Sequence, residues 1–315
     1  MSGNSLLTVV GAWGLLDHFL AMESLPADGE TVRTLPGSVP AGEVFFGDCS
    51  GNIAAVAAAM GSRVRFVTVA GRDFESSGYG AHLRKLGVDL RGVTILPDLL
   101  SGHNYNCFSP DGGGFCITQQ GAAARQSPEM IREEWFADAA CTVICEAFSP
   151  YTLRAAEAAK DAGGTVVLSG MVGDRNPLWE DFLRLADLLF MNRSEYGRLL
   201  ELAGAEADLF TRFGLRALFI TCGAEGAWVI TPDGAAAVPV VPAPQVTDPT
   251  GAGDAFVAGT VSALLRGFPP ARAALLGAAA SSFVIEDFGC QTRLPDWEGA
   301  LERIKSAGKE DLLYA

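Results

Sequence analysis

The sequence predicts an α/β fold of three layers, in which a mostly parallel central sheet lies between helices. Short apolar runs rich in β-branched residues alternate along the chain with longer Ala-rich or amphipathic stretches of helical length. Parallel strands are buried on both faces and are joined by helical crossovers, which is the order seen here. The chain has 315 residues and 49% hydrophobic content, which is enough for a core of this size.

Strand-like and helix-like segments alternate from the first strand onward. The expected strands are 6–10, 65–69, 142–146, 165–169, 188–191 and 218–221. The expected helices are 53–60, 79–86, 150–162, 178–186, 194–203, 252–265 and 271–286. No internal repeat or low-complexity linker divides the chain, so we expect residues 1–315 to form a single domain.

Two segments, 15–46 and 101–119, interrupt this alternation. They lack helical periodicity, contain Gly, Pro and Asp turn signals, and include β-like pieces at 104–108 and 115–118. We expect these segments to pair into a small sheet inserted within the domain. The competing interpretation is an ordinary surface hairpin.

Composition excludes several classes of function. Acidic residues number 37 against 23 basic ones, for a net charge of −14, whereas a nucleic-acid surface needs clustered Lys and Arg. The seven cysteines form no C-x-x-C pair and fit small core residues in a reducing compartment. There is no leader pattern and no apolar run of about 18 residues, so we expect a cytoplasmic protein outside the membrane. The three histidines are far apart and lack zinc-ligand spacing.

The most informative stretch is 248–259, Asp-Pro-Thr-Gly-Ala-Gly-Asp-Ala-Phe-Val-Ala-Gly. Backbone N–H groups at Gly251, Ala252 and Gly253, at the positive end of a helix, can hold an oxyanion. Asp254 lies one turn inside that helix. A carboxylate beside an anion site is expected where a hydroxyl loses its proton while it attacks a phosphate. The alternative is a Gly-rich capped helix start.

This stretch resembles the second signature of the ribokinase-like (PfkB) carbohydrate kinase family, which usually reads Asp-Thr-x-Gly-Ala-Gly-Asp-x-Phe. The resemblance implies a ribokinase-like α/β/α fold, ATP as phosphoryl donor and Asp254 as the catalytic base. It implies that the amides of Gly251, Ala252 and Gly253 form the anion hole. Asp248 matches a position that contributes to a monovalent-cation loop in some members, so K⁺ is a further candidate. The two inserted segments correspond to a β lid over the sugar site, which often doubles as a dimer interface in relatives.

The region after residue 46 resembles the family's first signature, Gly-Gly-x-x-x-Asn-x-Ala followed by Gly-x-Asp-x-x-Gly. Gly47 and Asn52 match its substrate-binding positions, and an Asn amide offers both a donor and an acceptor to neighbouring hydroxyls. Asn52 could instead cap its helix. Asp48 stands where the family usually has a second Gly, so it adds a carboxylate that could face the substrate.

Asp17 and Glu146 complete the expected substrate site. Asp17 follows the first strand, where the family places a carboxylate that binds two sugar hydroxyls; a turn Asp is the competing interpretation. Glu146 ends the expected strand 142–146, and ligands of open α/β sheets gather at the carboxyl ends of strands. Some ribokinase-like sugar kinases have a substrate-contacting Glu at the matching place.

Two further motifs resemble the family's nucleotide side. Asn192 and Glu195 match its Asn-x-x-Glu motif, which implies that Glu195 organises Mg²⁺, largely through water; a capping box at the same residues is compatible with this role. Thr221, Gly223 and Gly226 match a Thr-x-Gly-x-x-Gly segment that contacts the nucleotide. Nothing resembles a P-loop.

Together these motifs predict an ATP-dependent kinase that phosphorylates a primary hydroxymethyl group of a sugar. Nucleosides remain open, because residues 286–291 resemble the C-terminal Glu-x-x-Gly-x-Gln pattern of bacterial adenosine kinases. Phe46, Phe108 or Phe115 could then stack on a base. A third hypothesis is a non-catalytic sensor of the same fold. Asp254 speaks against it, because a sensor needs no base.

Overall fold

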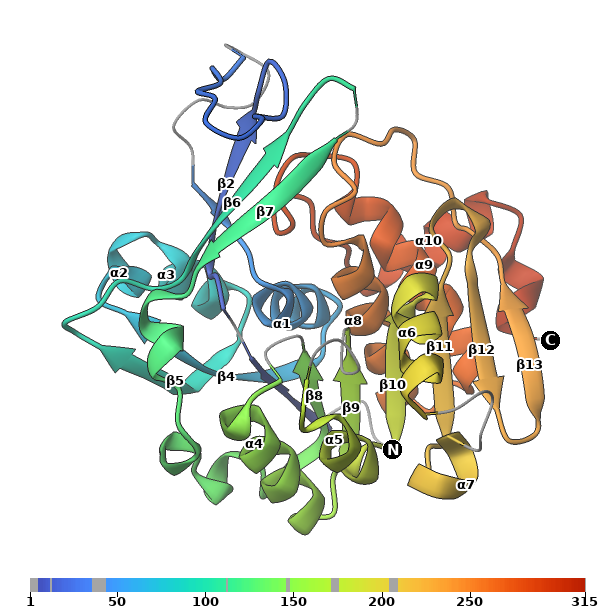
Figure 1. Cartoon of the computed structure of the whole chain (residues 1–315). Coiled ribbons are helices and arrows are strands. Elements are labelled where there is room, and N and C mark those ends of the chain that lie inside the picture. Colours follow the sequence, from blue (N-terminus) through green and yellow to red (C-terminus); the bar gives the residue numbers. More distant parts are fainter. Residues whose placement is uncertain are drawn as a thin grey trace.

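A computed structural model describes residues 5–11, 13–35, 44–111, 113–145, 148–170, 176–203 and 209–314. Within these residues, nine strands form one sheet in the order β13-β12-β11-β10-β9-β8-β1-β4-β5 (Figure 1). The strands are β1 (Leu6–Val10), β4 (Arg63–Gly71), β5 (Asp89–Leu96), β8 (Ala139–Cys145), β9 (Thr165–Ser169), β10 (Leu188–Asn192), β11 (Ala217–Thr221), β12 (Ala227–Thr231) and β13 (Gly234–Val238). All pair in parallel except β12 and β13, which extend one edge as an antiparallel hairpin. The predicted mostly parallel sheet is confirmed.

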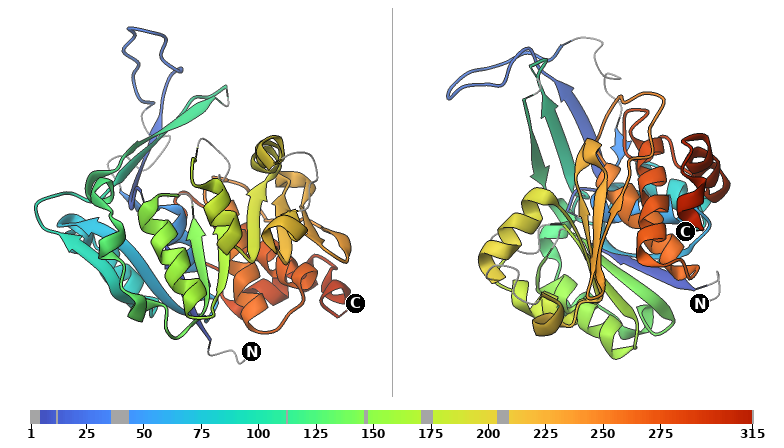
Figure 2. Two further views of the ribbon diagram at one scale, coloured as in Figure 1. Left: turned by 60° about the horizontal axis from the view of Figure 1, so that its bottom comes forward. Right: turned by 90° about the vertical axis from the view of Figure 1, so that its right-hand side faces the viewer.

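Helices cover both faces of this sheet, as the right view of Figure 2 shows. One layer consists of α1 (Cys49–Ala59), α3 (Tyr79–Lys85), α8 (Ala252–Leu265), α9 (Pro270–Val284) and α10 (Trp297–Ser306). The other consists of α4 (Pro150–Asp161), α5 (Trp179–Leu185), α6 (Arg193–Ala203) and α7 (Leu209–Phe213). A short helix, α2 (Asp73–Ser76), precedes α3, and five 3₁₀ turns lie in the described connections: η1 (Gly121–Arg125), η2 (Pro128–Met130), η3 (Glu133–Trp135), η4 (Gly223–Glu225) and η5 (Glu310–Leu313).

Alternate residues of the central strands enter two separate cores. Val9 and Phe190 pack toward the α8 layer, whereas their neighbours Val10 and Leu189 pack toward the α4 layer. Successive side chains of a strand point to opposite faces, so a strand covered on both sides must be apolar throughout. This explains why the sequence shows uninterrupted apolar runs there.

Helix α8 is buried along most of its length and packs closely on α9. A Cβ placed on Gly259 would lie 2.9 Å from the Cβ of Ala280 and from the Cα of Gly277. Glycine at these positions therefore lets the two helix backbones approach each other closely. The tight packing fixes α8, and with it the start of the helix, where Asp254 lies.

The two inserted segments form a second sheet of four strands among the described residues, in the order β3-β2-β6-β7. Its strands are β2 (Leu16–Ala21), β3 (Phe45–Phe46), β6 (His103–Phe108) and β7 (Gly114–Gln119). This sheet projects away from the main body beside the carboxyl ends of the central strands (Figure 1, Figure 2). The predicted small sheet is confirmed, and its position fits a lid.

Two histidines that are distant in sequence meet at the root of this lid. His18 Nε2 and His103 Nδ1 are 2.8 Å apart, and His103 Nε2 lies 3.2 Å from the Asp73 carboxylate of the main body. Burial, followed by the neighbouring His103, lowers the pKa of His18. These contacts link the lid to the main body. The described residues contain no group of three or more His, Cys, Asp or Glu side chains able to hold a metal ion.

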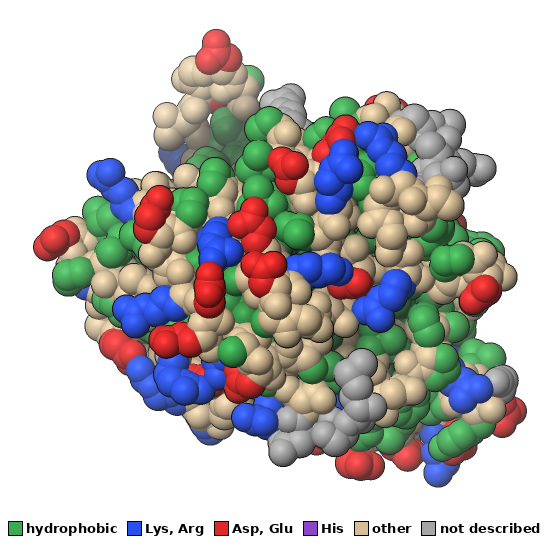
Figure 3. Space-filling model, turned by 90° about the horizontal axis from the view of Figure 1, so that it is seen from below, with side chains coloured by type: hydrophobic (Ala, Val, Ile, Leu, Met, Phe, Trp, Pro, Cys, Tyr) green, Lys and Arg blue, Asp and Glu red, His purple; other side chains and the backbone are tan. Residues whose placement is uncertain are grey.

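Surface chemistry is mixed. On the face seen in Figure 3, acidic and basic side chains are interspersed instead of forming one basic stripe. The seven cysteines, all in described segments, are free thiols. No helix in the described ranges has the length and apolar character needed to cross a bilayer.

Candidate active site

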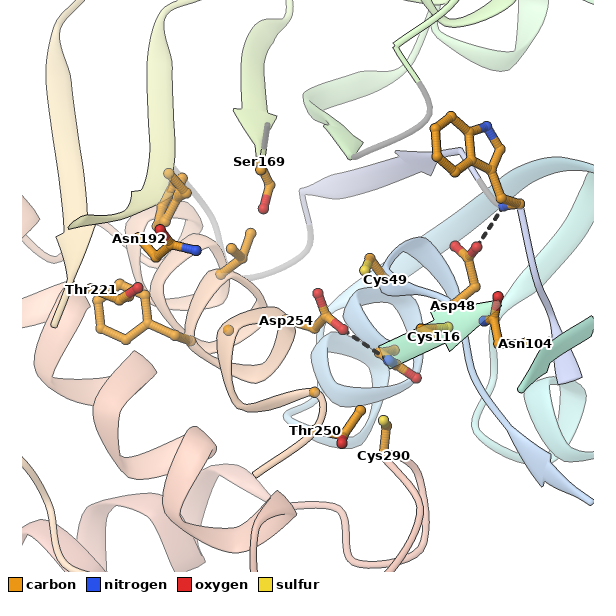
Figure 4. Close-up of a pocket in the computed structure, with 18 of the residues that line it drawn as sticks. Asp48, Cys49, Asn104, Cys116, Ser169, Asn192, Thr221, Thr250, Asp254 and Cys290 are labelled. Atoms are coloured by element: carbon orange, nitrogen blue, oxygen red, sulfur yellow. Dashed lines mark hydrogen bonds between the residues drawn. The ribbon is translucent and has the colours of Figure 1, made fainter. Parts of the chain in front are cut away.

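A cleft of about 380 Å³ lies where the lid, the start of α8 and the carboxyl ends of β9 to β11 meet (Figure 4). Its walls carry the polar groups that the sequence motifs supplied, together with several that they did not. The lining side chains and backbone include Trp13, Asp17, Asp48, Cys49, Asn52, Asn104, Asn106, Cys116, Thr118, Ser169, Asn192, Glu195, Thr221, Thr250, Gly251, Gly253, Asp254 and Cys290.

The start of α8 forms one wall of the cleft. Gly251 is its N-cap residue and has φ 78°, and a Cβ there would lie 2.8 Å from the Cβ of Cys290. Both the conformation and the space therefore require glycine. Gly251 and Gly253 line the cleft, whereas Ala252 does not, and the Ala252 N–H donates to the Pro249 carbonyl at 3.2 Å. The amide of Ala252 is therefore engaged in the turn before α8, and the anion hole remains a prediction.

Asp254 lines the cleft from the first turn of α8, as Figure 4 shows. Its Oδ2 accepts a hydrogen bond of 2.8 Å from Asn52 Nδ2. The other end of the Asn52 amide, Oδ1, accepts from Gln291 Nε2 at 3.0 Å. Asn52 is buried inside α1 and is not its cap, so the capping alternative is wrong. In this structure its amide orients the neighbouring carboxylate.

Asp48 is the N-cap residue of α1 and lies in an unusual conformation. Among described residues other than glycine, it alone has a positive φ, of 69°. Its carboxylate accepts from Trp13 N (2.6 Å), Gly14 N (3.0 Å), Ser50 N (3.0 Å) and Ser50 Oγ (2.7 Å). A carboxylate has about four acceptor sites, so protein donors already occupy them. Asp48 therefore ties the connection before the lid to α1, and little acceptor capacity remains for a substrate.

Asp17 lies in β2 on the lid face that points into the cleft, so it is not a turn residue. Its side chain is 3% exposed, and it accepts from Asn104 Nδ2 at 2.8 Å. Burial raises the pKa of Asp17 to about 7; the Asn104 hydrogen bond opposes this shift and the Asp48 charge adds to it. Gly47 does not line the cleft, but a Cβ there would lie 1.9 Å from Asp17 Oδ2.

Asn192 and Glu195 lie together on the opposite side of the cleft. The Glu195 N–H donates to Asn192 Oδ1 at 2.9 Å, and the Asn192 N–H donates to Glu195 Oε2 at 2.8 Å. This reciprocal pair is the predicted capping box at the start of α6. Both residues line the cleft, so the cap leaves their side chains facing it.

The remaining expected residues have different placements. Thr221 ends β11 and lines the cleft, but Gly223 and Gly226 do not. A Cβ on Gly226 would lie 2.2 Å from the Val238 carbonyl of β13, so close packing at the start of β12 explains this glycine. Glu146 lies outside the described residues.

Asp248 is 7% exposed and lies directly before the α8 start. Its Oδ1 accepts from the backbone N–H and the hydroxyl of Thr250, at 3.0 and 2.6 Å. Its Oδ2 is buried and has no hydrogen-bond partner among the described residues. A buried carboxylate oxygen without a donor is costly unless a cation balances it.

Several site residues were not predicted from the sequence. Trp13 and Asn104 line the cleft although no motif contained them. For Asn104, the sequence signal is its place in the β-like piece 104–108, where alternate residues face the same side of a strand. None of the phenylalanines proposed to stack on a base lines the cleft. Phe46 instead stacks on Tyr79, with ring centroids 4.7 Å apart.

The family assignment follows from comparison with known proteins. The profile described as "pfkB family carbohydrate kinase" matches residues 33–297. The chain belongs to the pfkB family of carbohydrate kinases. It is accordingly an ATP-dependent kinase.

Relatives of this pfkB-family kinase act on nucleosides and on ribose. It is 27% identical to a nucleoside kinase of Methanocaldococcus jannaschii, over 95% of this chain and 96% of the relative. It is also 27% identical to a ribokinase of Arabidopsis thaliana, over 95% and 81% of the two chains.

Solved structures share its fold. The M. jannaschii nucleoside kinase superimposes with a TM-score of 0.85 at 24% identity, covering 97% of this chain and all of that one (100%). Arabidopsis ribokinase, solved with ribose and ATP, gives a TM-score of 0.81 at 25% identity, with 97% and 99% of the two chains covered. A Burkholderia thailandensis nucleoside kinase in complex with inosine gives 0.80 at 22% identity, with 96% and 97% covered.

Proposed function

We propose that this kinase transfers the γ-phosphate of ATP to the primary hydroxymethyl group of a sugar, with Asp254 as the general base. The observation that carries the proposal is the position of Asp254 in one continuous cleft. Asn104 of the lid lies on one side of it, and Asn192 and Thr221 lie on the other (Figure 4). Asp17, which accepts from Asn104, also lines the cleft. We propose that the lid and the main body act as one catalytic unit around this cleft.

In the proposed step, the acceptor hydroxyl gives its proton to the Asp254 carboxylate as its oxygen attacks the terminal phosphorus. The new P–O bond forms in line with the bond to the departing ADP oxygen, which breaks. Negative charge on the phosphoryl oxygens is stabilised by the amides of Gly251 and Gly253 and by the positive end of α8. Loss of one such donor typically costs about 3–4 kcal/mol of transition-state stabilisation.

The cleft also fits a magnesium ion held mainly through water and phosphate. Asn192 and Glu195 provide oxygen atoms, the ligand type that Mg²⁺ prefers, on a partly solvated wall where the ion can keep its water ligands. Bound Mg²⁺ would neutralise phosphate charge. We further propose Asp248 as a ligand of a monovalent cation such as K⁺, because its buried Oδ2 lacks a donor.

Asp17 and Asn104 are proposed to bind two hydroxyls of the sugar ring. An ionised carboxylate accepts hydrogen bonds, and the Asn104 amide oxygen accepts from the Thr118 hydroxyl at 2.8 Å, which fixes its direction. Thr221 is proposed to contact the nucleotide phosphates, with Gly223 beside it. Glu146 remains a proposed contact with the sugar.

A nucleoside is the second candidate acceptor, and Trp13 favours it. Trp13 lines the cleft beside Asp48, to which its backbone N–H donates at 2.6 Å, and its half-buried indole offers an aromatic surface on which a base could stack. Ribose and a nucleoside carry the same hydroxymethyl group, so the proposed chemistry is unchanged. The M. jannaschii and B. thailandensis relatives, both named as nucleoside kinases, support this candidate.

The outer face of the lid is proposed to pair with a second copy of the chain. Strand register places His18, Tyr105 and Ile117 on the face opposite the cleft, and Phe115 shares that face. Ile117 is 55% exposed and Phe115 is 41% exposed. Sedimentation of wild type and the Phe115→Glu/Ile117→Lys variant tests this proposal; unchanged mass would oppose it.

The function is tested by measuring ADP release with MgATP and a panel of pentoses, hexoses and nucleosides. We expect one class to give turnover well above the acceptor-free rate, and Asp254→Asn to lower that turnover by about 10²–10⁴-fold. Inactivity with every acceptor, in protein that still binds ATP and a polyol, would support the sensor hypothesis instead.

A further inference from the structure

We infer that Gln291 positions the catalytic base by fixing the direction of the Asn52 amide. Gln291 is 6% exposed and lies in the segment after α9, outside the cleft. Its Nε2 donates to Asn52 Oδ1 at 3.0 Å, and Asn52 Nδ2 donates to Asp254 Oδ2 at 2.8 Å. The inference rests on the proposed role of Asp254 as the base.

An amide has one accepting end and one donating end, and Gln291 decides which end meets Asp254. Because Asn52 Oδ1 accepts the hydrogen of Gln291, only Nδ2 can point at the carboxylate. Reversal of the amide would place an oxygen lone pair against the Asp254 oxygens, which repel it. Gln291 therefore sets both the direction of the amide and the orientation of the base.

Tyr79 anchors the other side of Gln291. Its hydroxyl accepts from Gln291 Nε2 at 2.7 Å and donates to the Gly47 carbonyl at 3.0 Å. Gly47 directly follows β3 of the lid sheet, and the buried Tyr79 ring stacks on Phe46 of that strand. The chain of hydrogen bonds thus runs from the root of the lid to the catalytic carboxylate.

The interior of α1 is shaped to admit this chain. Gly51 lies in the helix, where glycine is less favourable than alanine. A Cβ at Gly51 would lie 2.0 Å from the Tyr79 hydroxyl oxygen and 3.5 Å from Gln291 Nε2. The glycine is therefore explained by the space that Tyr79 and Gln291 occupy.

The segment that carries Gln291 is held firmly at both ends. Glu286 is 4% exposed and pairs with Arg303 of α10 and with Arg293, the latter at 2.7 Å. Cys290 packs against Gly251 at the α8 start. One rigid segment thereby supports both the proposed anion site and, through Asn52, the base.

The test is a kinetic double-mutant cycle of Gln291→Leu and Asn52→Leu with the best acceptor found in the screen. Displacement of a reacting group by about 1 Å can cost about a hundredfold in rate. We expect Gln291→Leu to lower kcat about tenfold or more while KM for ATP stays unchanged. Because Gln291 acts through Asn52, we expect it to lower kcat no further when Asn52 is already leucine.

Gln291→Glu and Thr292→Val separate positioning from packing. An ionised glutamate keeps the shape of Gln291 but has no hydrogen to donate to Asn52, so kcat, measured at a pH high enough to ionise it, should fall at least as far as with leucine. The Thr292 hydroxyl donates to Phe288 O within the same segment and not to Asn52, so Thr292→Val should keep wild-type kcat. Thermal denaturation confirms that each variant is folded.

Wild-type kcat in folded Gln291→Glu, or additive losses in the cycle, would overturn the inference while leaving the proposed function intact. Absence of transfer by the wild type with every acceptor would instead overturn the proposed function, and this inference with it.

Discussion

Acceptor binding should strengthen as pH rises through 7, because the cleft contains a carboxyl group that is half protonated there. Asp17 is buried, and burial raises its pKa from the ordinary 3.8 to about 7 despite the Asn104 hydrogen bond. A sugar hydroxyl donates to the ionised carboxylate, so the acceptor binds that form preferentially. With a pKa of about 7, the ionised fraction rises from about 9% at pH 6 to about 91% at pH 8.

The expected magnitude is therefore about a tenfold lower Kd at pH 8 than at pH 6, or about 1.4 kcal/mol. Calorimetry without nucleotide measures this difference directly and removes any contribution from the titration of ATP. Asp17→Asn cannot ionise, so the variant should bind more weakly and show a flat profile over the same range. Burial also raises the pKa of Asp48. Any pH dependence that remains in Asp17→Asn would therefore come from Asp48 and not from Asp17.

The same shift has a consequence for stability with the opposite sign. The unfolded Asp17 ionises near its ordinary value of 3.8, whereas the folded carboxyl keeps its proton to about pH 7. The folded state binds more protons in this window, so stability without acceptor should fall as pH rises from 3.8 to about 7. A flat Kd in the wild type, or the same slope in Asp17→Asn, would refute the reasoning.

Three further predictions concern other parts of the site. Asp254→Asn should lower kcat by about 10²–10⁴-fold, the usual contribution of a general base, while Kd for ATP stays unchanged. A decrease in kcat of less than tenfold would contradict the role of Asp254 as the base. Asp48→Ala should have a free energy of unfolding about 1–3 kcal/mol lower than that of Asp48→Gly, because alanine retains the strain of φ 69° and glycine does not. Urea denaturation measures this difference, and equal stability of the two variants would show that the strain is negligible. Gly51→Ala should destabilise the protein by about 1–3 kcal/mol despite its better helix propensity. Adding Tyr79→Phe should recover part of that loss, since Cζ lies 3.2 Å from the added methyl position and the hydroxyl only 2.0 Å; a stabilised Gly51→Ala would contradict the crowding.

Much of the local structure was predictable because it depends on short-range pattern. The expected segments 6–10, 165–169 and 252–265 coincide with β1, β9 and α8. The hairpin of β12 and β13 was missed because β13 consists of Gly, Ala and a single Val, which have weak strand preference without a neighbour to pair with. Pairing with β12 at the sheet edge makes this segment a strand.

The site residues likewise divide into those predictable from nearby sequence and those that depend on distant contacts. Asp254, Asn192 and Glu195 belong to short motifs whose chemistry is encoded within a few residues, and the structure places all three in the cleft. The function of Asp48 was not predictable, because its four donors include the backbone of Trp13 and Gly14, more than thirty residues earlier.

The sequence by itself determined the alternation of strands and helices, the glycine-rich start of α8, and the acid next to it, since each arises from neighbours along the chain. Only the tertiary structure decided which side chains act together. Asn52 and Gln291 are 239 positions apart, and His18 and His103 are 85 apart. Hydrogen bonds of this kind have no local signature, because their geometry exists only after the sheet, its helices and the lid have packed against one another.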